Sequence, residues 1–287
     1  MKGIAFTKMH GVGNDYIYIN CFEEGQEEDW PELARQISDR HFGVGSDGLI
    51  LILPSDKADF RMRMFNADGS EGEMCGNGMR AFAKYVYERG MTTKRSFTVE
   101  TLAGIIRPEV QVTDGEVTSV RVDLGEPRLR REEIPMVGRP GERVIDEPLE
   151  VEGAVYRVTA VSMGNPHVVI FVDDVDAVDL EHLGPRFEHH PAFPQRVNVE
   201  FVQVLNRQEI KMRIWERGSG ITLGSGTGSS ASVVASVLNG KVDRAVTVHL
   251  PGGDLFIEWG QDNRIYMTGP AEEVCEGVFT KWRRRKH

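Results

Sequence analysis

The stretch FRMRMFNADGSEGEMCGNG, residues 60–78, decides the fold because the chain contains it twice. Residues 210–228 read IKMRIWERGSGITLGSGTG and align with it without a gap, at an offset of 150. Each copy begins with an alternating run that predicts a strand, followed by a glycine-rich turn. An apolar segment then predicts a helix, over 79–88 in the first copy and 229–238 in the second. Gly90 and Gly240 stand where a helix C-cap glycine belongs.

Two shorter pairs of segments extend the repeat in both directions. Thr98–Gly104 resembles Thr247–Gly253 at an offset of 149, and Gly13-Asn14 resembles Gly164-Asn165 at an offset of 151. Matches that keep their order along the chain indicate an internal duplication, and two copies predict two similar domains rather than a solenoid. We therefore expect a mixed α/β (α+β) chain in two pseudo-symmetric halves.

Apolar and alternating patterns predict further elements between the repeated segments. Strands are expected at 16–21, 49–53, 97–101, 155–161, 168–172, 199–205, 246–250 and 255–259. Helices are expected at 31–40 and 178–183. The second repeat helix has no charged residue between Gly226 and Gly240, which predicts that it is buried. Residues 127–140 are rich in Arg, Glu and Pro and lack periodicity, so the domain boundary is expected there.

The composition excludes several classes of partner. The chain has 287 residues, enough for two domains of ordinary size, and a net charge of −10, which argues against nucleic-acid binding. The basic segment 281–286 is interpreted as a solvated end rather than an RNA-binding arm. No apolar run approaches the length of a membrane helix and the N-terminus shows no secretory signal, so we expect a cytoplasmic protein with no membrane partner.

The three cysteines are Cys21, Cys75 and Cys275. An odd, sparse count argues against a disulfide framework, and no zinc-like spacing predicts a metal site. The ordinary interpretation of a single cysteine is a small buried hydrophobe. Only Cys75 has a neighbourhood that favours chemistry.

Both predicted helix starts have the composition of an anion-binding turn. Cys75-Gly76-Asn77-Gly78 precedes one helix and Ser225-Gly226-Thr227-Gly228 the other. A helix N-terminus carries unpaired N–H groups and partial positive charge, so it binds carboxylates and lowers a thiol's pKa. Either turn alone is most simply a helix start shaped by glycine.

The duplication strengthens the functional interpretation. If the two halves face each other, both helix starts point into one cleft around a substrate carboxylate. Cys75 and Ser225 would then flank an α-carbon, one removing its proton and the other returning a proton to the opposite face. This chemistry requires no metal and no pyridoxal phosphate, and we expect no cofactor.

Six motifs then resemble those of the diaminopimelate epimerase family, in that family's order and spacing. They are MHGVGND at 9–15, FNADGSE at 65–71, CGNG at 75–78, SMGNPH at 162–167, RVN at 196–198 and WERG at 215–218. The resemblance covers essentially the whole chain. It implies a cofactor-independent isomerase that interconverts L,L- and meso-diaminopimelate, in the pathway to lysine and cell-wall precursors.

The resemblance also implies roles for individual residues. Cys75 matches one of the family's two acid–base cysteines, and the second falls on Ser225. Glu216 would lie near the reacting amino group. The residues that would hold the distal end of the substrate are Asn14, Asn66, Asn165, Asn198 and Arg217. The other residues expected to bind substrate are those of the helix starts, Gly76, Asn77, Gly226 and Thr227.

Each of these polar residues also has an ordinary explanation. The asparagines beside Gly or Pro are typical of turns, and Glu216 with Arg217 is typical of a solvated surface pair. His167 is either a structural histidine or one that orients Glu216. Five positions that match one family outweigh the separate explanations.

The family fold implies two domains, each with strands wrapped around a central helix. The expected limits are 1–127 for the first domain, to which 272–287 returns, and 128–271 for the second. A homodimer is compatible with this architecture.

Ser225 is the main departure from the family pattern. Several neighbours of Ser225 depart as well, which indicates natural divergence rather than one introduced substitution. A thiolate is accessible near neutral pH, whereas a serine needs a base to activate it, and no histidine is adjacent in sequence.

Three functions therefore stay open. The first is a diaminopimelate epimerase with serine in the place of one thiol. The second is a racemase, single-base isomerase or eliminating enzyme that acts on a different amino acid. The third is a catalytically weak paralogue that only binds an amino acid. The retained distal residues favour the first, and the retained Cys75 argues against the third.

Overall fold

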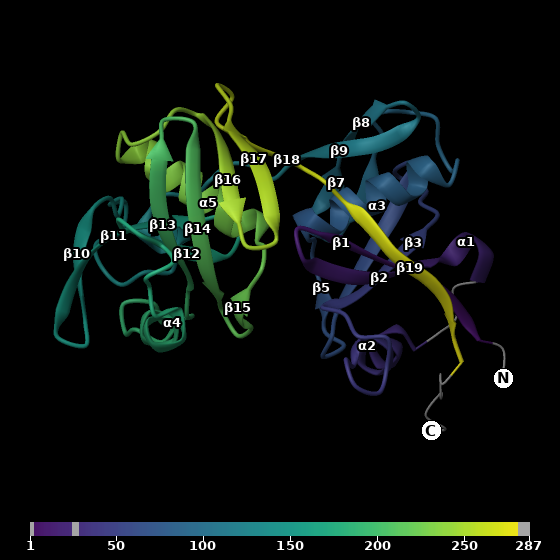
Figure 1. Ribbon diagram of the computed structural model, residues 1–287, viewed down its shortest axis with the longest axis horizontal. Coiled ribbons are helices and arrows are strands. Elements are labelled where there is room, and N and C mark those ends of the chain that lie inside the picture. Colours follow the sequence, from purple (N-terminus) through teal and green to yellow (C-terminus); the bar gives the residue numbers. More distant parts are fainter. Residues whose placement is uncertain (1–2, 25–28, 281–287) are drawn as a thin grey trace. The chain divides into compact units, whose positions relative to one another are not determined.

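A computed structural model describes residues 3–24 and 29–280 of the chain (Figure 1). The chain divides into two compact units, Met1–Val122 with Gly269–His287 (unit 1) and Asp123–Thr268 (unit 2). The domain limits expected at 127/128 and 271/272 stay a prediction. The basic segment 281–286 lies outside the described residues.

Unit 1 is built on one mixed sheet with the strand order β19-β1-β2-β3-β4-β6-β7, and β5 pairs with β4. Its sheet strands are β1 (Ile4–Gly11), β2 (Asn14–Asn20), β3 (Gly48–Leu53), β4 (Phe60–Asn66), β5 (Glu71–Gly72), β6 (Val99–Thr101), β7 (Gly104–Ile106) and β19 (Glu272–Phe279). The hairpin strands β8 (Glu109–Thr113) and β9 (Glu116–Asp123) follow. The helices are α1 (Cys21–Glu24), α2 (Trp30–Ser38) and α3 (Gly76–Glu88).

Unit 2 contains a sheet with the order β10-β11-β12-β13-β14-β16-β17-β18, and β15 pairs with β14. Its strands are β10 (Glu147–Val151), β11 (Ala154–Ser162), β12 (Pro166–Phe171), β13 (Asn198–Asn206), β14 (Glu209–Glu216), β15 (Gly220–Thr222), β16 (Ala245–Leu250), β17 (Gly253–Trp259) and β18 (Ile265–Gly269). Its helices are α4 (Leu180–Glu188), α5 (Gly226–Leu238) and the 3₁₀ turn η1 (Arg131–Glu133).

The strand pairing of the two units is the same through the repeated segments. The strands β2 and β3 run parallel, as do β12 and β13; β4 and β6 run parallel, as do β14 and β16. The short strands β5 and β15 pair antiparallel with β4 and β14. Even the registers agree, since Tyr16 pairs with Gly48 in unit 1 and His167 with Asn198 in unit 2. The duplication expected from the sequence is therefore present in the fold.

Each unit places its repeat helix against the strands. In unit 2, α5 packs on β11, β12, β13, β14, β16 and β17, and in unit 1, α3 packs on β1, β2 and β8. The residues of α5 from Gly228 to Ser236 are buried, which confirms the prediction from its lack of charge. Its buried serines are tolerated because hydroxyls such as those of Ser229 and Ser230 donate to carbonyls one turn back.

The second helix of each unit also repeats. The N-caps of α2 and α4 are Asp29 and Asp179, which have nearly the same backbone angles and accept from the N–H three residues on. The helix α2 covers a core that includes Ile17, Leu33 and Leu51. The equivalent core of unit 2 gathers around Phe187, whose ring meets that of Phe201 at 5.9 Å.

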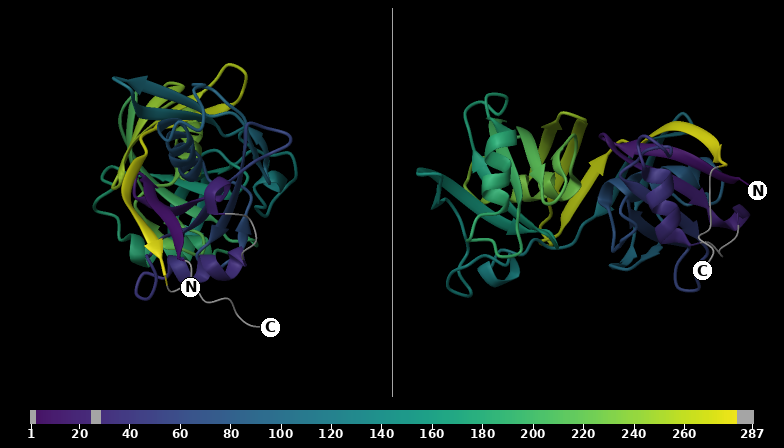
Figure 2. Two further views of the ribbon diagram at one scale, coloured as in Figure 1. Left: turned by 90° about the vertical axis from the view of Figure 1, so that its right-hand side faces the viewer. Right: turned by 90° about the horizontal axis from the view of Figure 1, so that it is seen from below.

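The C-terminal strand β19 pairs antiparallel with β1, as the family fold implied (Figure 2). Like β1, β8, β9, β10 and β18, it was not among the strands expected from the pattern. Five of the eight residues of β19 are exposed in a row, so its sequence carries no alternation that could have revealed it. Its identity as a strand depends on the backbone of β1 rather than on its own side chains.

Three sequence-based predictions need correction. Cys21 begins α1 instead of ending a strand, and α4 runs beyond Leu183, through Pro185, to Glu188 because Phe187 is held in the core. Cys275 lies exposed on β19, so the buried position typical of a cysteine holds for Cys21 only. In the part of the chain that the structure describes, no helix is long and apolar enough to cross a membrane.

Candidate active site

Cys75 is the N-cap of α3, where the turn after β5 enters the helix. Its sulfur accepts from the backbone N–H of Gly78 at 3.4 Å and lies 3.4 Å from Oδ1 of Asn14. A Cβ at Gly78 would come within 2.6 Å of the end of the Ile50 side chain, so helix and sheet approach closely here. The side chain is partly exposed, which keeps the sulfur within reach of a ligand.

Ser225 holds the equivalent place at the start of α5. Its backbone angles, φ −138° and ψ 121°, nearly equal those of Cys75, −131° and 123°. Its hydroxyl oxygen accepts from the N–H of Gly228 at 3.1 Å. Cys75 and Ser225, 150 positions apart in the sequence, are therefore equivalent N-caps in the two copies. One carries a thiol and the other a hydroxyl.

The pKa of Cys75 corrects the expectation of a lowered thiol pKa. Burial by the surrounding protein raises the pKa of the Cys75 thiol, and this is the largest effect. Hydrogen bonds from the Gly78 N–H and the Tyr16 phenol, and the charge of Arg80, act in the lowering direction that the helix start predicted. The helix N-terminus thus offsets burial without overcoming it.

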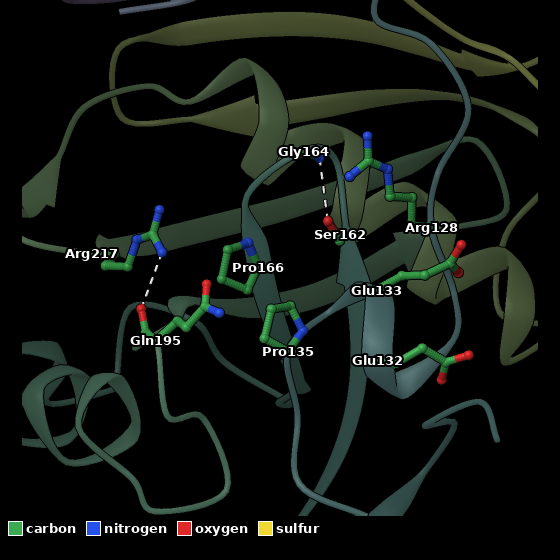
Figure 3. A pocket seen from close by; sticks show the side chains of 9 residues that line it. All are labelled: Arg128, Glu132, Glu133, Pro135, Ser162, Gly164, Pro166, Gln195 and Arg217. Carbon is green, nitrogen blue, oxygen red and sulfur yellow. Dashed lines mark hydrogen bonds between the residues drawn. The ribbon is translucent and has the colours of Figure 1, made fainter. Parts of the chain in front are cut away.

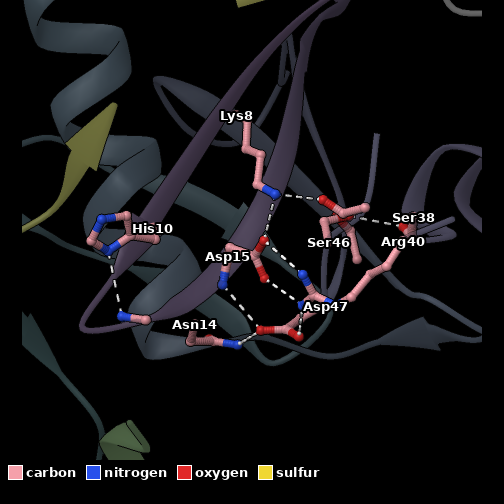
Figure 4. A network of polar contacts seen from close by, with 11 residues as sticks. Lys8, His10, Asn14, Asp15, Ser38, Arg40, Ser46 and Asp47 are labelled. Carbon is pink, nitrogen blue, oxygen red and sulfur yellow. Dashed lines mark hydrogen bonds and ion pairs between the residues drawn. The ribbon is translucent and has the colours of Figure 1, made fainter. Parts of the chain in front are cut away.

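Asn14 connects the thiol to a charged network (Figure 4). Its amide donates to Asp47 Oδ2 at 2.7 Å, and its Oδ1 accepts from Nδ2 of Asn77 at 3.3 Å. Asp47 in turn pairs with Arg40, which also holds Asp15 at 2.8 Å. Burial is the largest effect on both carboxyls. It raises the pKa of Asp47, whereas hydrogen bonds from Arg40 and Lys8 outweigh it and lower the pKa of Asp15.

The structure brings a buried His–Glu pair to the other helix start. Nδ1 of His167 lies 2.6 Å from Oε1 of Glu200, and its Nε2 lies 3.0 Å from Oδ1 of Asn165. Asn165 also donates to Thr227 at 3.4 Å. His167 and Glu200 are both fully buried, and burial raises the pKa of Glu200. Both ring nitrogens of His167 are thus engaged by Glu200 and Asn165, which favours a role in orienting Asn165.

Glu200 is also close to Ser225. A Cβ at Gly228 would lie 3.1 Å from Oε1 of Glu200 and 3.1 Å from the hydroxyl oxygen of Ser225. No histidine is adjacent to Ser225 in sequence, but the fold brings the titratable carboxyl group of Glu200 near it. We call Cys75, Asn14, Tyr16, Asn77 and Arg80 the thiol half, and Ser225, Asn165, His167, Glu200 and Thr227 the serine half.

The distal residues of unit 2 are fixed by hydrogen bonds rather than solvated. Asn198 is buried; its amide donates to Pro166 O at 2.9 Å and its Oδ1 accepts from the N–H of Arg217 at 2.9 Å. The guanidinium of Arg217 donates to Gln195 O at 3.1 Å, and Glu216 accepts from Thr222 at 2.8 Å. This arrangement differs from a Glu216–Arg217 surface pair.

Arg217 lines a polar cavity of about 450 Å³ inside unit 2 (Figure 3). The cavity wall includes both neighbours of Asn165, Gly164 and Pro166. Its other lining residues are Arg128, Glu132, Glu133, Pro135, Ser162 and Gln195. Cations and carboxylates in one cavity suit a ligand that carries both charges.

Asn66 has a different setting in unit 1. It ends β4, is exposed, and its amide donates to the hydroxyl of Ser70 at 2.9 Å. The structure brings Asn14 and Asn77 together with Cys75, and Asn165 and Thr227 together near Ser225. Gly76 and Gly226 are the first residues of the two helices.

Three residues of the two halves were missed by sequence reasoning. Glu200 lies within the apolar strand Val199–Val202, and Arg80 within the apolar segment after Met79. A charge inside an apolar run was the available signal, because such a residue is buried with its neighbours and requires a partner. Tyr16 had no signal beyond its position two residues after Asn14.

The fold defines a structural class whose solved members include a phenazine biosynthesis protein and a hydroxyproline epimerase. A Bacillus anthracis protein of the PhzF phenazine biosynthesis family matches with a TM-score of 0.70, at 19% identity, over 97% of this chain and 99% of that chain. A hydroxyproline epimerase from Agrobacterium vitis, solved with bound trans-4-hydroxy-L-proline, matches with a TM-score of 0.66, at 14% identity, over 97% and 91%. At these identities the likeness concerns the fold alone.

Sequence comparison defines the family within this class. The sequence model of the diaminopimelate epimerase family matches residues 6–130 and 159–274. The diaminopimelate epimerase of Pelotomaculum thermopropionicum is 62% identical over 275 residues, 96% of this chain and 98% of that protein. That of Geobacillus kaustophilus is 57% identical over 282 residues, 97% of each chain. The chain belongs to the diaminopimelate epimerase family.

Proposed function

We propose that this protein interconverts L,L- and meso-diaminopimelate by removing and returning the α-proton. The observation that carries the proposal is that Cys75 is the N-cap of α3. This chain, which is a member of the family, thus has a thiol at a helix start that can bind an α-carboxylate. Cys75 is the base that takes the proton, and Ser225 occupies the place of the second acid–base group. The reaction uses no cofactor.

The helix starts bind the amino acid through their backbone N–H groups, those of Gly76 and Asn77 in unit 1 and those of Gly226 and Thr227 in unit 2. Glu216 lies near the reacting amino group. The distal zwitterion is held by Arg217 together with Asn14, Asn66, Asn165 and Asn198. The hydrogen bonds that fix Asn198 and Arg217 support this role, since fixed donors lose little entropy on binding.

Ser225 sets the rate. A hydroxyl is a much weaker acid than a thiol, so proton return from Ser225 and proton removal by it are both costly. Because both stereoisomers must interconvert with one equilibrium constant, the cost appears as slow turnover in both directions. Glu200 is a titratable group in the neighbourhood of Ser225, since both would contact a Cβ placed at Gly228.

The decisive experiment follows both proton exchange and stereochemistry. Purified protein is incubated with L,L-diaminopimelate in deuterium oxide, and α-deuterium uptake and the meso isomer are measured together. We expect uptake accompanied by the meso isomer. Uptake with L-alanine at equal efficiency would instead identify a racemase of short amino acids. Absence of uptake with any amino acid would identify a binding protein.

The setting of the protein is part of the proposal. We propose a cytoplasmic enzyme of lysine and cell-wall precursor synthesis that acts on a small amino acid, without nucleic-acid or membrane partners. A homodimer is the assembly we propose to test by light scattering.

A further inference from the structure

Arg80 is the largest fully buried side chain among the described residues. It lies on α3, five residues after Cys75, and none of its surface reaches solvent. Burying a guanidinium is costly unless the protein supplies partners for its charge. A buried cation inside the helix that carries the candidate base therefore requires an explanation beyond packing.

Hydrogen bonds lead from Arg80 to the thiol. Nη1 of Arg80 donates to Oδ1 of Asn77 at 2.8 Å, and Asn77 donates to Oδ1 of Asn14 at 3.3 Å. The same Asn14 oxygen lies 3.4 Å from the sulfur of Cys75. Nε of Arg80 donates to the carbonyl of Pro270 at 3.1 Å, which fixes the guanidinium plane.

The sheet leaves a place for this side chain. A Cβ at Gly11 of β1 would come within 2.7 Å of Nη2 of Arg80, so only glycine leaves room for the guanidinium. The group is thus enclosed between α3, β1 and the chain at Pro270. Its position is determined by the fold on three sides, which is the condition for a preorganised charge.

The acidic groups around Arg80 are few. The charges of Cys75 and Tyr18 act on it, while burial lowers the pKa of Arg80 to about 10. Burial raises the pKa of Tyr18 well above its ordinary value, and its hydroxyl donates to Gly78 O at 2.9 Å, so this phenol stays neutral. Tyr16 also faces the thiol, with Asp47 acting on its phenol. Among these groups the thiol is the one that can ionise to pair with Arg80.

Unit 2 has no counterpart of this cation. At the offset of 150 that relates Cys75 to Ser225, Arg80 corresponds to Ser230, whose hydroxyl donates to Gly226 O. A charge needed merely to hold a helix against its sheet would be expected in both copies. It is present only in the copy that carries the thiol.

We propose that Arg80 is a positioning residue of the thiol half, a buried permanent cation that stabilises the thiolate of Cys75. Its charge acts on the sulfur through space, because the Asn14 oxygen between them is an acceptor to which the thiol donates, and it touches no substrate. The inference rests on the proposed function, because it takes Cys75 as the base. It adds the buried charge that makes this partly buried thiol ionisable.

The test measures thiol ionisation without substrate, so it is independent of whether diaminopimelate is turned over. The rate of Cys75 alkylation by iodoacetamide is followed by peptide mass spectrometry from about pH 6 to 10 in the parent, Arg80→Gln and Arg80→Lys proteins. We expect Arg80→Gln to slow alkylation at pH 7 by about tenfold or more, and Arg80→Lys to restore most of it. Lys84→Met, which removes a cation one turn further along α3, should change the rate by less than about twofold.

Equal pH profiles for the Gln and Lys variants, or a Gln profile like that of the parent, would overturn the proposal. If Arg80→Gln does not fold, Ser225→Cys supplies the test with Arg80 intact. The thiol introduced there starts a helix without a buried cation, and it should react at pH 7 about tenfold or more slowly than Cys75 in the same molecule. An introduced thiol that reacts as fast as Cys75 contradicts the role of Arg80.

Discussion

The thiol half and the serine half have the same backbone and different electrostatics. Cys75 and Ser225 cap their helices with nearly equal angles, and Asn14 and Asn165 occupy equivalent positions. Behind Cys75 lie a phenol, Tyr16, and a permanent cation, Arg80. Behind Ser225 lies a buried His167–Glu200 pair with 2.6 Å between Nδ1 and Oε1.

The difference follows from single positions in equivalent strands. Tyr16 corresponds to His167 at an offset of 151, and Ile50 corresponds to Glu200 at an offset of 150. Parallel pairing of β2 with β3 and of β12 with β13 puts the members of each pair on neighbouring strands with the same offset of two positions, since Tyr16 pairs with Gly48 and His167 with Asn198. The two units therefore have equal helix starts but different buried residues behind them. Those of unit 1 suit a thiolate, and those of unit 2 suit a protonated group.

The strongest way to break the comparison is to remove the thiol. Cys75→Ala should reduce α-deuterium uptake from diaminopimelate by at least the roughly 10²–10⁴-fold that a positioned acid–base group supplies. The control is Cys275→Ala, which removes an exposed thiol and should leave uptake unchanged. Normal uptake by Cys75→Ala would show that Cys75 is not the base.

Making the two halves alike should act in the opposite direction. Ser225→Cys should raise epimerisation by up to about 10²–10⁴-fold, because a thiol at the same N-cap is a much stronger acid than the hydroxyl it replaces and exchanges its proton more readily. The affinity for substrate, measured by calorimetry, should change little since the distal contacts stay intact. An unchanged or lower rate in a folded variant with reduced Cys75 argues for a single-base enzyme or a binding protein.

The distal contacts belong mainly to the serine half's unit. At an offset of 150, Arg217 corresponds to Ala67, so unit 1 has no equivalent cation. Arg217→Met should weaken diaminopimelate binding about tenfold or more, since a lost hydrogen bond to a charged group costs about 1.5–3 kcal/mol. Arg213→Met on β14, the strand that ends just before Arg217, removes a guanidinium that donates to Val175 O and Val178 O and should leave affinity unchanged. Equal affinities in the Arg217→Met and parent proteins would remove Arg217 from the site.

The buried pair of the serine half should matter for stability. Glu200→Gln should lower the free energy of unfolding by about 1.5 kcal/mol, because the charge-assisted hydrogen bond to His167 is lost in a buried site. The matched control is Glu209→Gln, which weakens an exposed contact with His249 and should change stability by less than about 0.5 kcal/mol. Urea unfolding measures the free energy of unfolding of both variants. Equal losses of stability would show that burial does not strengthen the interaction between His167 and Glu200.

The charged network of Lys8, Asp15, Arg40 and Asp47 predicts that the stability of the protein depends on pH. Unit 2 has no equivalent effect, because Asp15 corresponds to Pro166 there. Although burial acts in the raising direction, hydrogen bonds from Arg40 and Lys8 lower the pKa of Asp15 below 3.8. Its stabilisation is therefore fully present above about pH 3.8 and is lost as the pH falls through the folded-state value. Asp15→Asn should cost about 1 kcal/mol at pH 7, and this difference should shrink on acidification. A difference that grows at low pH contradicts the sign.

Much of the architecture could be predicted from the repeat. The strand–turn–helix unit around Cys75 recurs around Ser225, and its glycines at 90 and 240 have positive φ, as helix C-caps require. Edge strands such as β19 could not be predicted, because the hydrogen bonds of a partner strand define them. The extension of α4 through Pro185 was likewise decided by the core position of Phe187.

The sequence by itself determined the duplication, the two helix starts and the family, because these depend on local residue order and on spacing along one chain. Only the tertiary structure decided what lies behind each start. Arg80 reaches Pro270 across 190 residues, and His167 meets Glu200 across 33. Burial then sets the direction of the pKa shifts of Cys75 and Glu200, since desolvation depends on everything packed around a group and not on its sequence neighbours alone.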